Sequence, residues 1–424
     1  MKDYRCPRGT QDSLPPESSN WQKVEMIMQS LAQYYGYQKI DTPIFEDTGV
    51  FKRENDSSDM VNKEMYTFSI NSVDSLTLRP EGTAGVIRSY VQNKMYALPD
   101  QPIKLYYLGP MFRYERPQKG RYRQFNQFGI ECIGAKSPLL DAEGIALGYS
   151  IVKALGLSQI VVKINSLGDN ESRKNYREKL IDYFTPHSSE LCLDCQRRLT
   201  QNPLRILDCK EDKDNPVLKE VPLISSSLNE ASVEYFDQVK KALDALDIPY
   251  EVDDKLVRGL DYYTDTVFEV QSTNPLSGTQ NTVFAGGRYD GLVNYFGGPE
   301  VSGFGFAMGI ERLLLLAEDE KIDLESTEKT DIYVMSIGEV GTKPLEIATI
   351  ARAMGYVTGF NFENKSLKSQ FKTVDRLEAK LAIIVGESEL ANNKVNIKDL
   401  RNSEQVTVDL DKLSETIDQM LGEK

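Results

Sequence analysis

The chain has 424 residues, enough for two or three domains, and its 40% hydrophobic and 27% charged content is ordinary for a soluble globular protein. A net charge of −14 argues against non-specific nucleic-acid binding by the whole surface, and no apolar run approaches the roughly 20 residues that span a bilayer. The N-terminus lacks a signal-peptide core, and five cysteines fit a reducing cytosol better than a disulfide scaffold. We therefore expect a cytoplasmic protein without membrane contacts.

The first third of the chain alternates between predicted helices and strands. Apolar residues at helical spacing predict a helix over 17–35 that ends before Gly36. The next stretch, 37–47, indicates a strand interrupted at Pro43, which suits an edge or an interface. Further along the chain the predicted elements are a strand at SLTLRP (75–80), a helix reaching Met95, a strand at IKLYYLG (103–109) and a helix near 138–155.

The stretch 111–131, MFRYERPQKGRYRQFNQFGIE, predicts two strands joined by a long hairpin loop that turns at 117–120. Basic residues outnumber the single acid, Glu115, in its first half. Clustered guanidinium groups repel each other unless phosphate or carboxylate neutralises them, so this loop predicts an anionic partner. A solvated charged loop is the alternative.

Residues 156–250 are rich in charge and helix formers and contain a cysteine cluster, HSSELCLDCQRRLTQNPLRILDC. The cysteines Cys192, Cys195 and Cys209 could bind zinc together with His187, the single histidine of the chain. The pair Cys-x-x-Cys suits zinc, but a lone cysteine at the far end does not make a second knuckle. Free thiols in a helical insert are the default, so we predict no metal held by protein side chains.

Strand-like, glycine-rich sequence resumes over 255–309 and leads into a helix at IERLLLLAED. The run GIECIGAKS is no phosphate loop, because Ala135 separates Gly134 from Lys136. Nor does GFGFAMG (303–309) have the spacing of a dinucleotide site, and we expect its glycines to let the strand approach a flat ligand. Arg312 in the first helical turn opposes the helix dipole, which indicates an anionic ligand or a nearby carboxylate.

After a polar linker at 319–331 the chain alternates strand, helix and strand, which predicts a small α/β domain. Basic residues recur there at helical spacing: Lys365, Lys368, Lys372 and Arg376. They form either a solvated face or a contact with nucleic-acid phosphates.

Several of these stretches resemble the signature sequences of class II aminoacyl-tRNA synthetases. The Pro43 region is similar to motif 1, which in such enzymes builds the dimer interface. Residues 111–131 are similar to motif 2 and GFGFAMGIERL (303–313) to motif 3. These motifs indicate the class but not the amino acid.

Other stretches resemble sequences particular to the histidyl-tRNA synthetase family, bacterial type, and the resemblance covers essentially the whole chain. RGTQD (8–12) is similar to its N-terminal signature. The histidine-specific signatures are LRPEGTA (78–84), LVRGLDYYTDTVFE (256–269) and AGGRYDGLV (285–293).

The resemblance implies an α+β fold: a catalytic domain over 1–325, with an antiparallel sheet flanked by helices and a helical insertion at 170–250, and an α/β anticodon-binding domain over 326–424. It implies ligation of L-histidine to tRNA(His) through a histidyl-adenylate, with ATP and Mg²⁺, in a cytoplasmic homodimer. The alternative is the synthetase-like regulatory subunit of ATP phosphoribosyltransferase. Such proteins usually lack the anticodon domain and do not retain arginines equivalent to Arg113, Arg258 and Arg312.

The resemblance also assigns roles to residues. Arg113 and Arg258 would be catalytic, and Arg113, Arg121 and Arg312 would bind ATP. The histidine site would comprise Glu81, Gly82, Thr83, Arg113, Gln127, Glu131, Arg258, Tyr262 and Tyr263. The tRNA acceptor end would meet Arg116, Gln118 and Arg123.

Overall fold

The structure, a computed structural model, describes residues 3–422 except 53–58, 71–73, 210, 260–261, 279–280, 325–329 and 364, so part of the predicted linker lies outside it. The chain divides into two compact units, 1–325 and 326–424, which are described separately. None of the helices in the described ranges is long and apolar enough to cross a membrane.

The first unit is organised around an eight-stranded sheet with the order β1-β5-β6-β11-β10-β9-β7-β8. Its strands are β1 (Gln38–Lys39), β5 (Ile103–Phe112), β6 (Gln124–Ile133), β7 (Ile160–Ser166), β8 (Tyr250–Val252), β9 (Thr264–Ser272), β10 (Thr282–Tyr289) and β11 (Gly303–Gly309). The six central strands are antiparallel, as predicted, whereas β1 and β8 pair in parallel with β5 and β7 at the two edges. The sheet is therefore mixed, and β7 is a strand that the sequence interpretation of 156–250 missed.

Strand β6 shows how the sequence divides the two faces of this sheet. Side chains alternate along a strand, so Phe128, Ile130 and Cys132 point to one face and Gln127 and Glu131 to the other. The first three belong to the main hydrophobic core. The predicted hairpin is confirmed, since β5 and β6 pair in register from Ile103–Ile133 to Phe112–Gln124.

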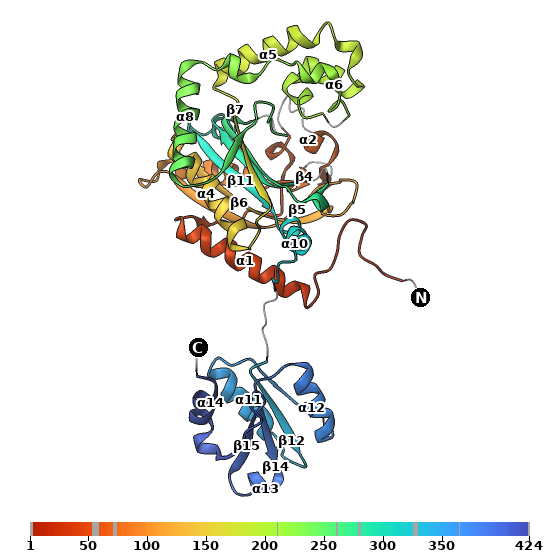
Figure 1. The fold of residues 1–424 in the computed structure, drawn as a ribbon, viewed down its shortest axis with the longest axis vertical. Helices are drawn as coiled ribbons and strands as arrows, with labels where there is room; N and C mark the ends of the chain where they lie inside the picture. The colour runs from red at the N-terminus through yellow and green to blue at the C-terminus, as the bar shows by residue number, and fades with distance from the viewer. Residues whose placement is uncertain are drawn as a thin grey trace. The chain divides into compact units, whose positions relative to one another are not determined.

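Helices cover the apolar face of the sheet: α1 (Glu17–Tyr34), α4 (Pro138–Ala154), α8 (Glu230–Ala245) and α10 (Ile310–Asp319) (Figure 1). Two glycines on α4 let the helix approach the strands closely. A Cβ at Gly144 would lie 2.4 Å from the Phe304 ring, and one at Gly148 would lie 2.3 Å from the Phe284 ring. Gly36, at φ +81°, follows α1 as predicted, in the left-handed conformation that glycine adopts freely.

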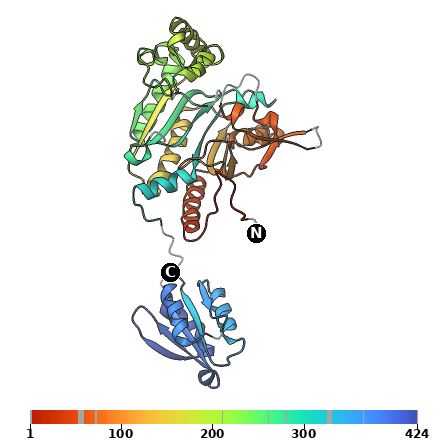
Figure 2. The same ribbon diagram turned by 90° about the vertical axis from the view of Figure 1, so that its right-hand side faces the viewer.

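Helices α3 (Thr83–Gln92) and α9 (Leu292–Tyr295) pack on the opposite face, against Tyr107 and Tyr289 of the sheet. A separate three-stranded sheet follows the order β2-β4-β3, and Figure 2 shows it beside the main sheet. It consists of β2 (Phe45–Asp47), β3 (Tyr66–Ile70) and β4 (Asp74–Leu78), and helix α2 (Asp59–Lys63) precedes β3. Pro43 lies between β1 and β2, which confirms the predicted interruption.

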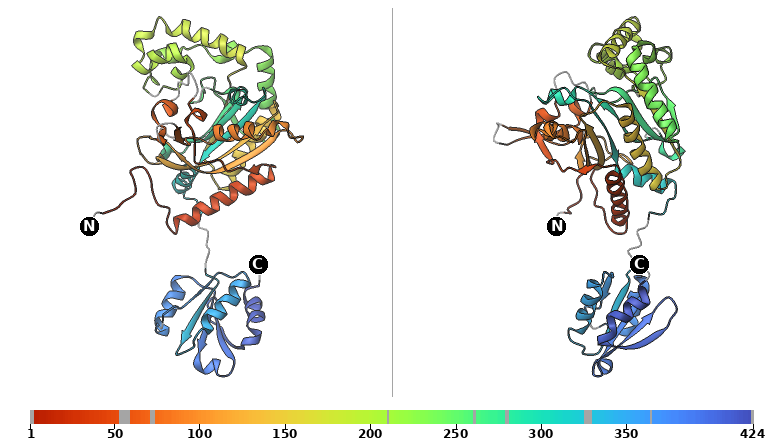
Figure 3. Two further views of the ribbon diagram at one scale, coloured as in Figure 1. Left: turned by 180° about the vertical axis from the view of Figure 1, so that it is seen from behind. Right: turned by 90° about the vertical axis from the view of Figure 1, so that its left-hand side faces the viewer.

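Between β7 and α8 the chain forms helices α5 (Asn170–Phe184), α6 (Leu193–Gln201) and α7 (Pro216–Lys219), with 3-10 turns η3 (Ser188–Glu190), η4 (Pro203–Ile206) and η5 (Ile224–Ser227). This segment packs around a second hydrophobic core, which it shares with Leu256, Val257, Tyr263 and Val267, and it stands at one end of the first unit (Figure 3). Helix α8, although within 170–250, packs on α4 and contributes Phe236, Val239 and Leu243 to the core beneath the sheet.

The second unit is a mixed five-stranded sheet with the order β13-β12-β14-β15-β16, so the predicted α/β pattern is confirmed. The strands are β12 (Ile332–Ile337), β13 (Thr358–Phe360), β14 (Leu381–Gly386), β15 (Lys394–Asp399) and β16 (Gln405–Asp409), and the helices are α11 (Lys343–Ala353), α12 (Leu367–Arg376), α13 (Glu387–Leu390) and α14 (Leu413–Leu421). The side chains of Lys368, Lys372 and Arg376 on α12 are exposed, as is Lys365 just before it.

Candidate active site

A cavity of about 290 Å³ opens on the polar face of the main sheet. Strands β5, β6, β10 and β11, the hairpin between β5 and β6, the segment before β9, and the starts of α3 and α10 contribute to its wall. Its polar lining comprises Glu81, Thr83, Arg113, Glu115, Arg121, Gln127, Arg258, Tyr262, Tyr263, Thr282, Glu311 and Arg312. The structure therefore brings together all four arginines predicted to carry the chemistry.

Two of these arginines come from the hairpin between β5 and β6, and Glu115 lies beside both. The Arg121 Nη1 atom is 3.2 Å from Glu115 Oε2, and the Arg113 Nη1 atom is 3.9 Å from Oε1. Arg113 also donates from Nε to the Pro80 carbonyl at 2.9 Å and lies 5.3 Å from the Phe125 ring centre. These contacts hold two cations at the cavity wall before any phosphate arrives.

Arg258 is held in a similar way from the opposite side of the cavity. Its Nη1 lies 2.7 Å from Glu269 Oε2. The other oxygen of Glu269 accepts from Thr282 Oγ1 at 2.5 Å and from Gln271 Nε2 at 2.9 Å. Because both carboxylate oxygens are engaged, Glu269 fixes the direction from which the guanidinium enters the site.

Arg312 lies in the first turn of α10, as the sequence indicated. Burial and then the positive charge of Arg121 lower the pKa of Arg312. Gly120 at the hairpin turn leaves space beside it, since a Cβ there would lie 3.4 Å from Arg312 Nη1. Two like charges near each other at a helix start favour binding of an anion with several negative oxygens.

Glu131 marks the other end of the site and is fully buried, with 0% exposure. Thr83 Oγ1 donates to Glu131 Oε1 at 2.6 Å, and the Tyr289 hydroxyl donates to Oε2. Burial raises the pKa of Glu131 to about 8, although these two hydrogen bonds lower it. Glu131 does not itself line the cavity; Thr83, which is bonded to it, does.

Two glycines of β11 make room for this buried pair, whereas the third, Gly309, lines the cavity, so the expected approach of the strand to a flat ligand stays a prediction for that position. A Cβ at Gly305 would lie 2.1 Å from Glu131 Oε2, and one at Gly303 would lie 2.1 Å from the Tyr289 ring. The close neighbours of the strand at Gly303 and Gly305 are therefore the chain's own side chains.

The remaining predicted histidine-binding residues surround the cavity next to Thr83. The Tyr262 hydroxyl donates to Glu81 Oε2 at 3.1 Å, and the Tyr262 and Tyr263 ring centres are 4.7 Å apart. The Oε1 atom of Gln127 is buried and has no hydrogen-bond partner among the described residues. Gly82 precedes α3, where a Cβ would lie 2.3 Å from the Tyr107 ring, so its observed role is to accommodate that ring.

The three residues predicted to meet the tRNA end differ in exposure. Arg116 and Gln118 are exposed. Arg123 is half-buried, donates from Nε to the Glu115 carbonyl at 3.1 Å and stacks 3.9 Å from the Tyr114 ring centre. Its backbone N–H also donates to the Gly9 carbonyl at 2.7 Å, which ties the hairpin to the N-terminal segment.

Sequence reasoning did not assign roles to Glu115, Glu269 or Tyr289, although each stands in a stretch that it singled out. Glu115 was visible as the lone acid in a basic loop, whereas nothing in the sequence shows that Tyr289 meets Glu131. Arg288, next to Tyr289, points to the opposite face and is fully buried against Asp141, with the Tyr235 hydroxyl 3.1 Å from the same carboxylate. Arg288 is therefore structural.

The first unit combines a largely antiparallel sheet, an arginine-lined cavity, a basic hairpin, and a final strand followed directly by a helix. These features together define the catalytic fold of class II aminoacyl-tRNA synthetases. Comparison with known proteins places the chain within that class. A histidyl-tRNA synthetase family model matches residues 9–313, and an anticodon-binding domain model matches residues 331–420. The chain therefore belongs to the histidyl-tRNA synthetase family.

Individual relatives agree with this assignment over nearly full length. The histidine–tRNA ligase of Bacillus subtilis (strain 168) is 53% identical over 411 residues, which is 96% of this chain and 97% of the relative. That of Staphylococcus aureus (strain JH9) is 49% identical over 414 residues, 97% and 99% of the two chains. The crystal structure of apo S. aureus histidyl-tRNA synthetase superposes with a TM-score of 0.84 at 43% identity, covering 98% of this chain and 100% of that one.

Proposed function

We propose that the chain ligates L-histidine to tRNA(His) in two steps. ATP and histidine form histidyl-adenylate and release pyrophosphate, and the histidyl group then passes to the tRNA and releases AMP. The observation that carries the proposal is a single cavity lined by four arginines, with the buried, hydrogen-bonded carboxylate of Glu131 directly behind Thr83 in its wall. Near-full-length relatives named histidine–tRNA ligase support it.

The arginines address the physical difficulty of the first step, in which an anion attacks an anion. Arg113 and Arg258, on opposite sides of the cavity, would bracket the histidine carboxylate and the α-phosphate. Arg121 and Arg312 would hold the β- and γ-phosphates. Because Glu115 and Glu269 already orient three of these cations, little reorganisation is needed when the negative charge arrives, which is the basis of electrostatic preorganisation.

Thr83 and Gln127 suit recognition of the α-ammonium group of histidine. Thr83 donates its hydroxyl proton to Glu131, so its oxygen can offer only lone pairs to the cavity. The buried Oε1 atom of Gln127 is a second acceptor without a described partner. Glu81, next to Gly82 at the start of α3, supplies a carboxylate that balances the ammonium charge.

The imidazole would be distinguished by Glu131 and Tyr263, with Tyr262 at the side of the pocket. A ring that lacks the matching nitrogen would leave buried polar groups unpaired, and such sites reject analogues strongly. In this structure Thr83 lies between Glu131 and the cavity and donates a hydrogen bond to Glu131. Direct contact between Glu131 and the imidazole therefore requires a side chain to move.

Mg²⁺ would enter with ATP. The lining carboxylates are each engaged already, Glu81 by Tyr262, Glu115 by Arg121 and Glu311 by the Asn126 backbone N–H. These carboxylates fit a Mg²⁺ ion that is coordinated mainly by phosphate oxygens, as is usual for Mg²⁺, rather than one that is coordinated entirely by protein side chains. The ion would supply further neutralisation of phosphate charge.

The acceptor end of the tRNA would meet the hairpin at Arg116 and Gln118, with Arg123 holding the hairpin in shape. The second unit would contact the anticodon, with the exposed basic face of α12 available for phosphates. A homodimer in the cytoplasm is supported by resemblance to motif 1 and by exposed apolar side chains next to Pro43, among them Ile44 and Phe45.

The alternative, a regulatory subunit of ATP phosphoribosyltransferase, is not favoured. Arg113, Arg258 and Arg312 all line the cavity, and an anticodon-binding unit follows the catalytic one. The structure named as such a subunit or histidyl-tRNA synthetase from Bacillus halodurans C is 20% identical with a TM-score of 0.63, so it shares the fold alone.

The test is ATP–pyrophosphate exchange measured with each amino acid in turn, followed by charging of tRNA(His). We expect exchange with histidine only and charging of tRNA(His) but not of a second, non-cognate tRNA. Folded protein that binds ATP yet shows no histidine-dependent exchange would refute the enzymatic proposal.

A further inference from the structure

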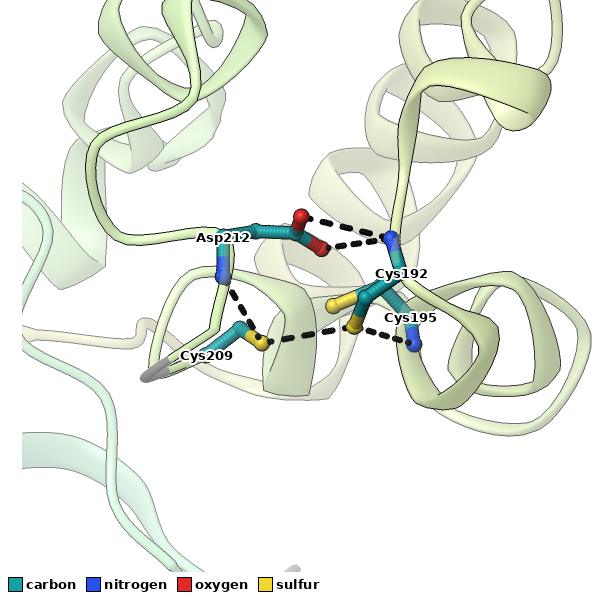
Figure 4. A group of neighbouring side chains, drawn as sticks. All are labelled: Cys192, Cys195, Cys209 and Asp212. Atoms are coloured by element: carbon teal, nitrogen blue, oxygen red, sulfur yellow. Dashed lines mark hydrogen bonds between the residues drawn. The ribbon is translucent and has the colours of Figure 1, made fainter.

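Three cysteines and one aspartate converge in the segment between β7 and α8. The Sγ atoms of Cys192, Cys195 and Cys209 and a carboxylate oxygen of Asp212 all lie within 4.8 Å of one another (Figure 4). Three of the four residues are buried and Cys192 is half-buried. From this geometry we propose that Cys192, Cys195, Cys209 and Asp212 form a structural zinc site.

The spacing of the four residues fits two equivalent half-sites. Cys192-Leu193-Asp194-Cys195 and Cys209 to Asp212 both place two donors three residues apart. The second half-site was not recognised in the sequence because its second donor is an oxygen rather than a sulfur. His187, the fourth ligand considered from the sequence, instead places Nδ1 2.8 Å from Glu190 Oε1.

Backbone hydrogen bonds repeat in the two half-sites. The Cys195 N–H donates to Cys192 Sγ at 3.4 Å, and the Asp212 N–H donates to Cys209 Sγ at 3.5 Å (Figure 4). Such bonds would stabilise the negative charge that each first cysteine acquires when it loses its proton to bind a metal. The Cys192 N–H in turn donates to both oxygens of Asp212, at 3.2 and 3.0 Å, and so orients the carboxylate toward the sulfurs.

The distances suit zinc better than a disulfide. Tetrahedral zinc with Zn–S bonds of about 2.3 Å holds its sulfurs about 3.8 Å apart. The Cys192 and Cys209 Sγ atoms are 3.7 Å apart, while a disulfide would require about 2.0 Å. A Cys192–Cys209 disulfide would leave the neighbouring Cys195 thiol and Asp212 carboxylate without a role, whereas a four-coordinate metal would bind all four groups.

Metal binding exchanges protons for zinc. Three neutral thiols each lose one proton, Asp212 is already ionised, and Zn²⁺ bonds to three sulfurs and one oxygen. Burial raises the pKa of the Cys195 thiol, so it stays protonated until the metal displaces its proton. Burial opposes ionisation of Asp212, but hydrogen bonds from Cys195 and the Cys192 backbone lower the pKa of that carboxyl.

The position of the site explains what a metal would stabilise. The segment around it consists of short helices and 3-10 turns over a small core that includes Cys195 and Cys209. Small cores of this kind often need a metal or disulfide to fold stably. The loop between the two half-sites carries Arg205, which is buried and donates from Nη1 to the Arg258 carbonyl at 3.2 Å. The metal would thus hold the segment that supports Arg258.

The test begins with untagged full-length protein grown with zinc and analysed by mass spectrometry for metal content. We expect about one zinc per chain. Cys192→Ser, Cys209→Ser and Asp212→Asn should lose most of it, while the matched controls Cys6→Ser and His187→Gln should keep it. Zinc-free wild-type protein, a Cys192–Cys209 disulfide, or equal zinc in the ligand variants would overturn the proposal.

A second measurement covers variants that fail to fold. Cobalt-substituted wild-type protein should show thiolate-to-cobalt charge-transfer absorption and the d–d bands of a tetrahedral site, and Asp212→Cys should keep the metal and strengthen the charge-transfer band. Absence of these bands in folded, cobalt-treated protein contradicts the site. The link to Arg258 is tested by removing zinc, which should abolish exchange activity, and by adding zinc back, which should restore it. This activity measurement alone rests on the proposed function, because metal content and absorption bands are measured without any assay of catalysis.

Discussion

The two ends of the catalytic cavity use glutamates in opposite ways. At the arginine end, Glu115 and Glu269 lie against guanidinium groups, at 3.2 Å from Arg121 and 2.7 Å from Arg258. At the other end Glu131 has hydroxyl donors as its hydrogen-bond partners and is fully buried, so its pKa rises to about 8. We therefore infer that the arginines provide positive charge for phosphates and that the buried carboxylate provides hydrogen bonds shielded from water.

The difference shows that burial and partner, rather than residue type, decide the task of a carboxylate. A glutamate paired with arginine stays charged and orients the cation, while a glutamate held by hydroxyls in a dry site is nearly poised between its two protonation states at neutral pH. Variants at the two ends should consequently fail in different ways.

The largest effect is expected at Arg258. Replacing Arg258 by Ala removes a cation that we propose faces the reacting groups, and loss of one such stabilising group typically costs about 10²–10³-fold in rate. Histidine-dependent ATP–pyrophosphate exchange measures the loss, and thermal unfolding should change little. The control is Arg177→Ala, an arginine of the insertion whose side chain donates hydrogen bonds to the backbone carbonyls of Thr200 and Gln201 and does not line the cavity. It should leave exchange unchanged. Equal losses in both variants would show that Arg258 has no special position.

A smaller effect is expected at Arg312, which we propose contacts the β- and γ-phosphates rather than the reacting α-phosphate. Arg312→Ala should raise the KM for ATP and lower kcat/KM by roughly 10²-fold, since it removes one charged contact to the triphosphate. The same assay at varied ATP concentration is the measurement. Arg312→Lys, which retains charge but not the forked donors, should fall between wild type and Ala; an unaltered KM for ATP in the Ala variant would place the triphosphate elsewhere.

Substitutions at Thr83 test the hydrogen bonds around the buried Glu131 carboxylate. Thr83→Val keeps the shape but removes the donor to Glu131, and leaving a buried acceptor unsatisfied costs about 1–3 kcal/mol. Chemical denaturation should register this loss, and the KM for histidine should rise. Thr83→Ser keeps the hydroxyl and should retain most of the stability; similar losses for Val and Ser would mean that packing, not the hydrogen bond, matters.

Glu131 gives the most specific effect, a dependence of folding stability on pH. Its carboxyl has a pKa of about 8 when folded against a reference value of 4.5, so the folded protein binds more protons between these values. Stability contributed by this group should therefore fall as pH rises through that window, by at most about 1.4 kcal/mol per pH unit, and level off above it.

Comparing wild type with Glu131→Gln isolates the contribution of Glu131 to the pH dependence of stability, because the two proteins share all other titrating groups, Glu311 among them. We expect the stability of the Gln variant relative to wild type to increase as pH rises from about 5 to 8. Parallel curves for the two proteins would show that Glu131 ionises normally in the folded state.

The sequence was sufficient to predict most of the residues that gather around the cavity. Alternation along β6 puts Gln127 and Glu131 on one face, and the arginines stand in or beside recognisable turns. These are local properties of strands and turns. The core helices α1 and α4 followed from apolar spacing in the same way.

Other features depend on contacts between distant residues and could not be read from local patterns. Strand β7 was missed because helix-rich sequence surrounds it. The burial of Glu131 requires Thr83 and Tyr289 from two other elements, and Asp212 joins the cysteines only through the fold of the insertion. Arg288 resembled a site residue in the sequence, yet its partner, Asp141, makes it part of the core.

The most direct test of the division between the two ends is crossed kinetics in ATP–pyrophosphate exchange with Arg312→Ala and Gln127→Ala. Arg312→Ala should raise the KM for ATP by about tenfold or more and leave that for histidine nearly unchanged, and Gln127→Ala should do the reverse. If both variants raised both KM values to the same extent, the two ends of the cavity would not have separate tasks, and the proposed division between phosphate and histidine binding would be contradicted.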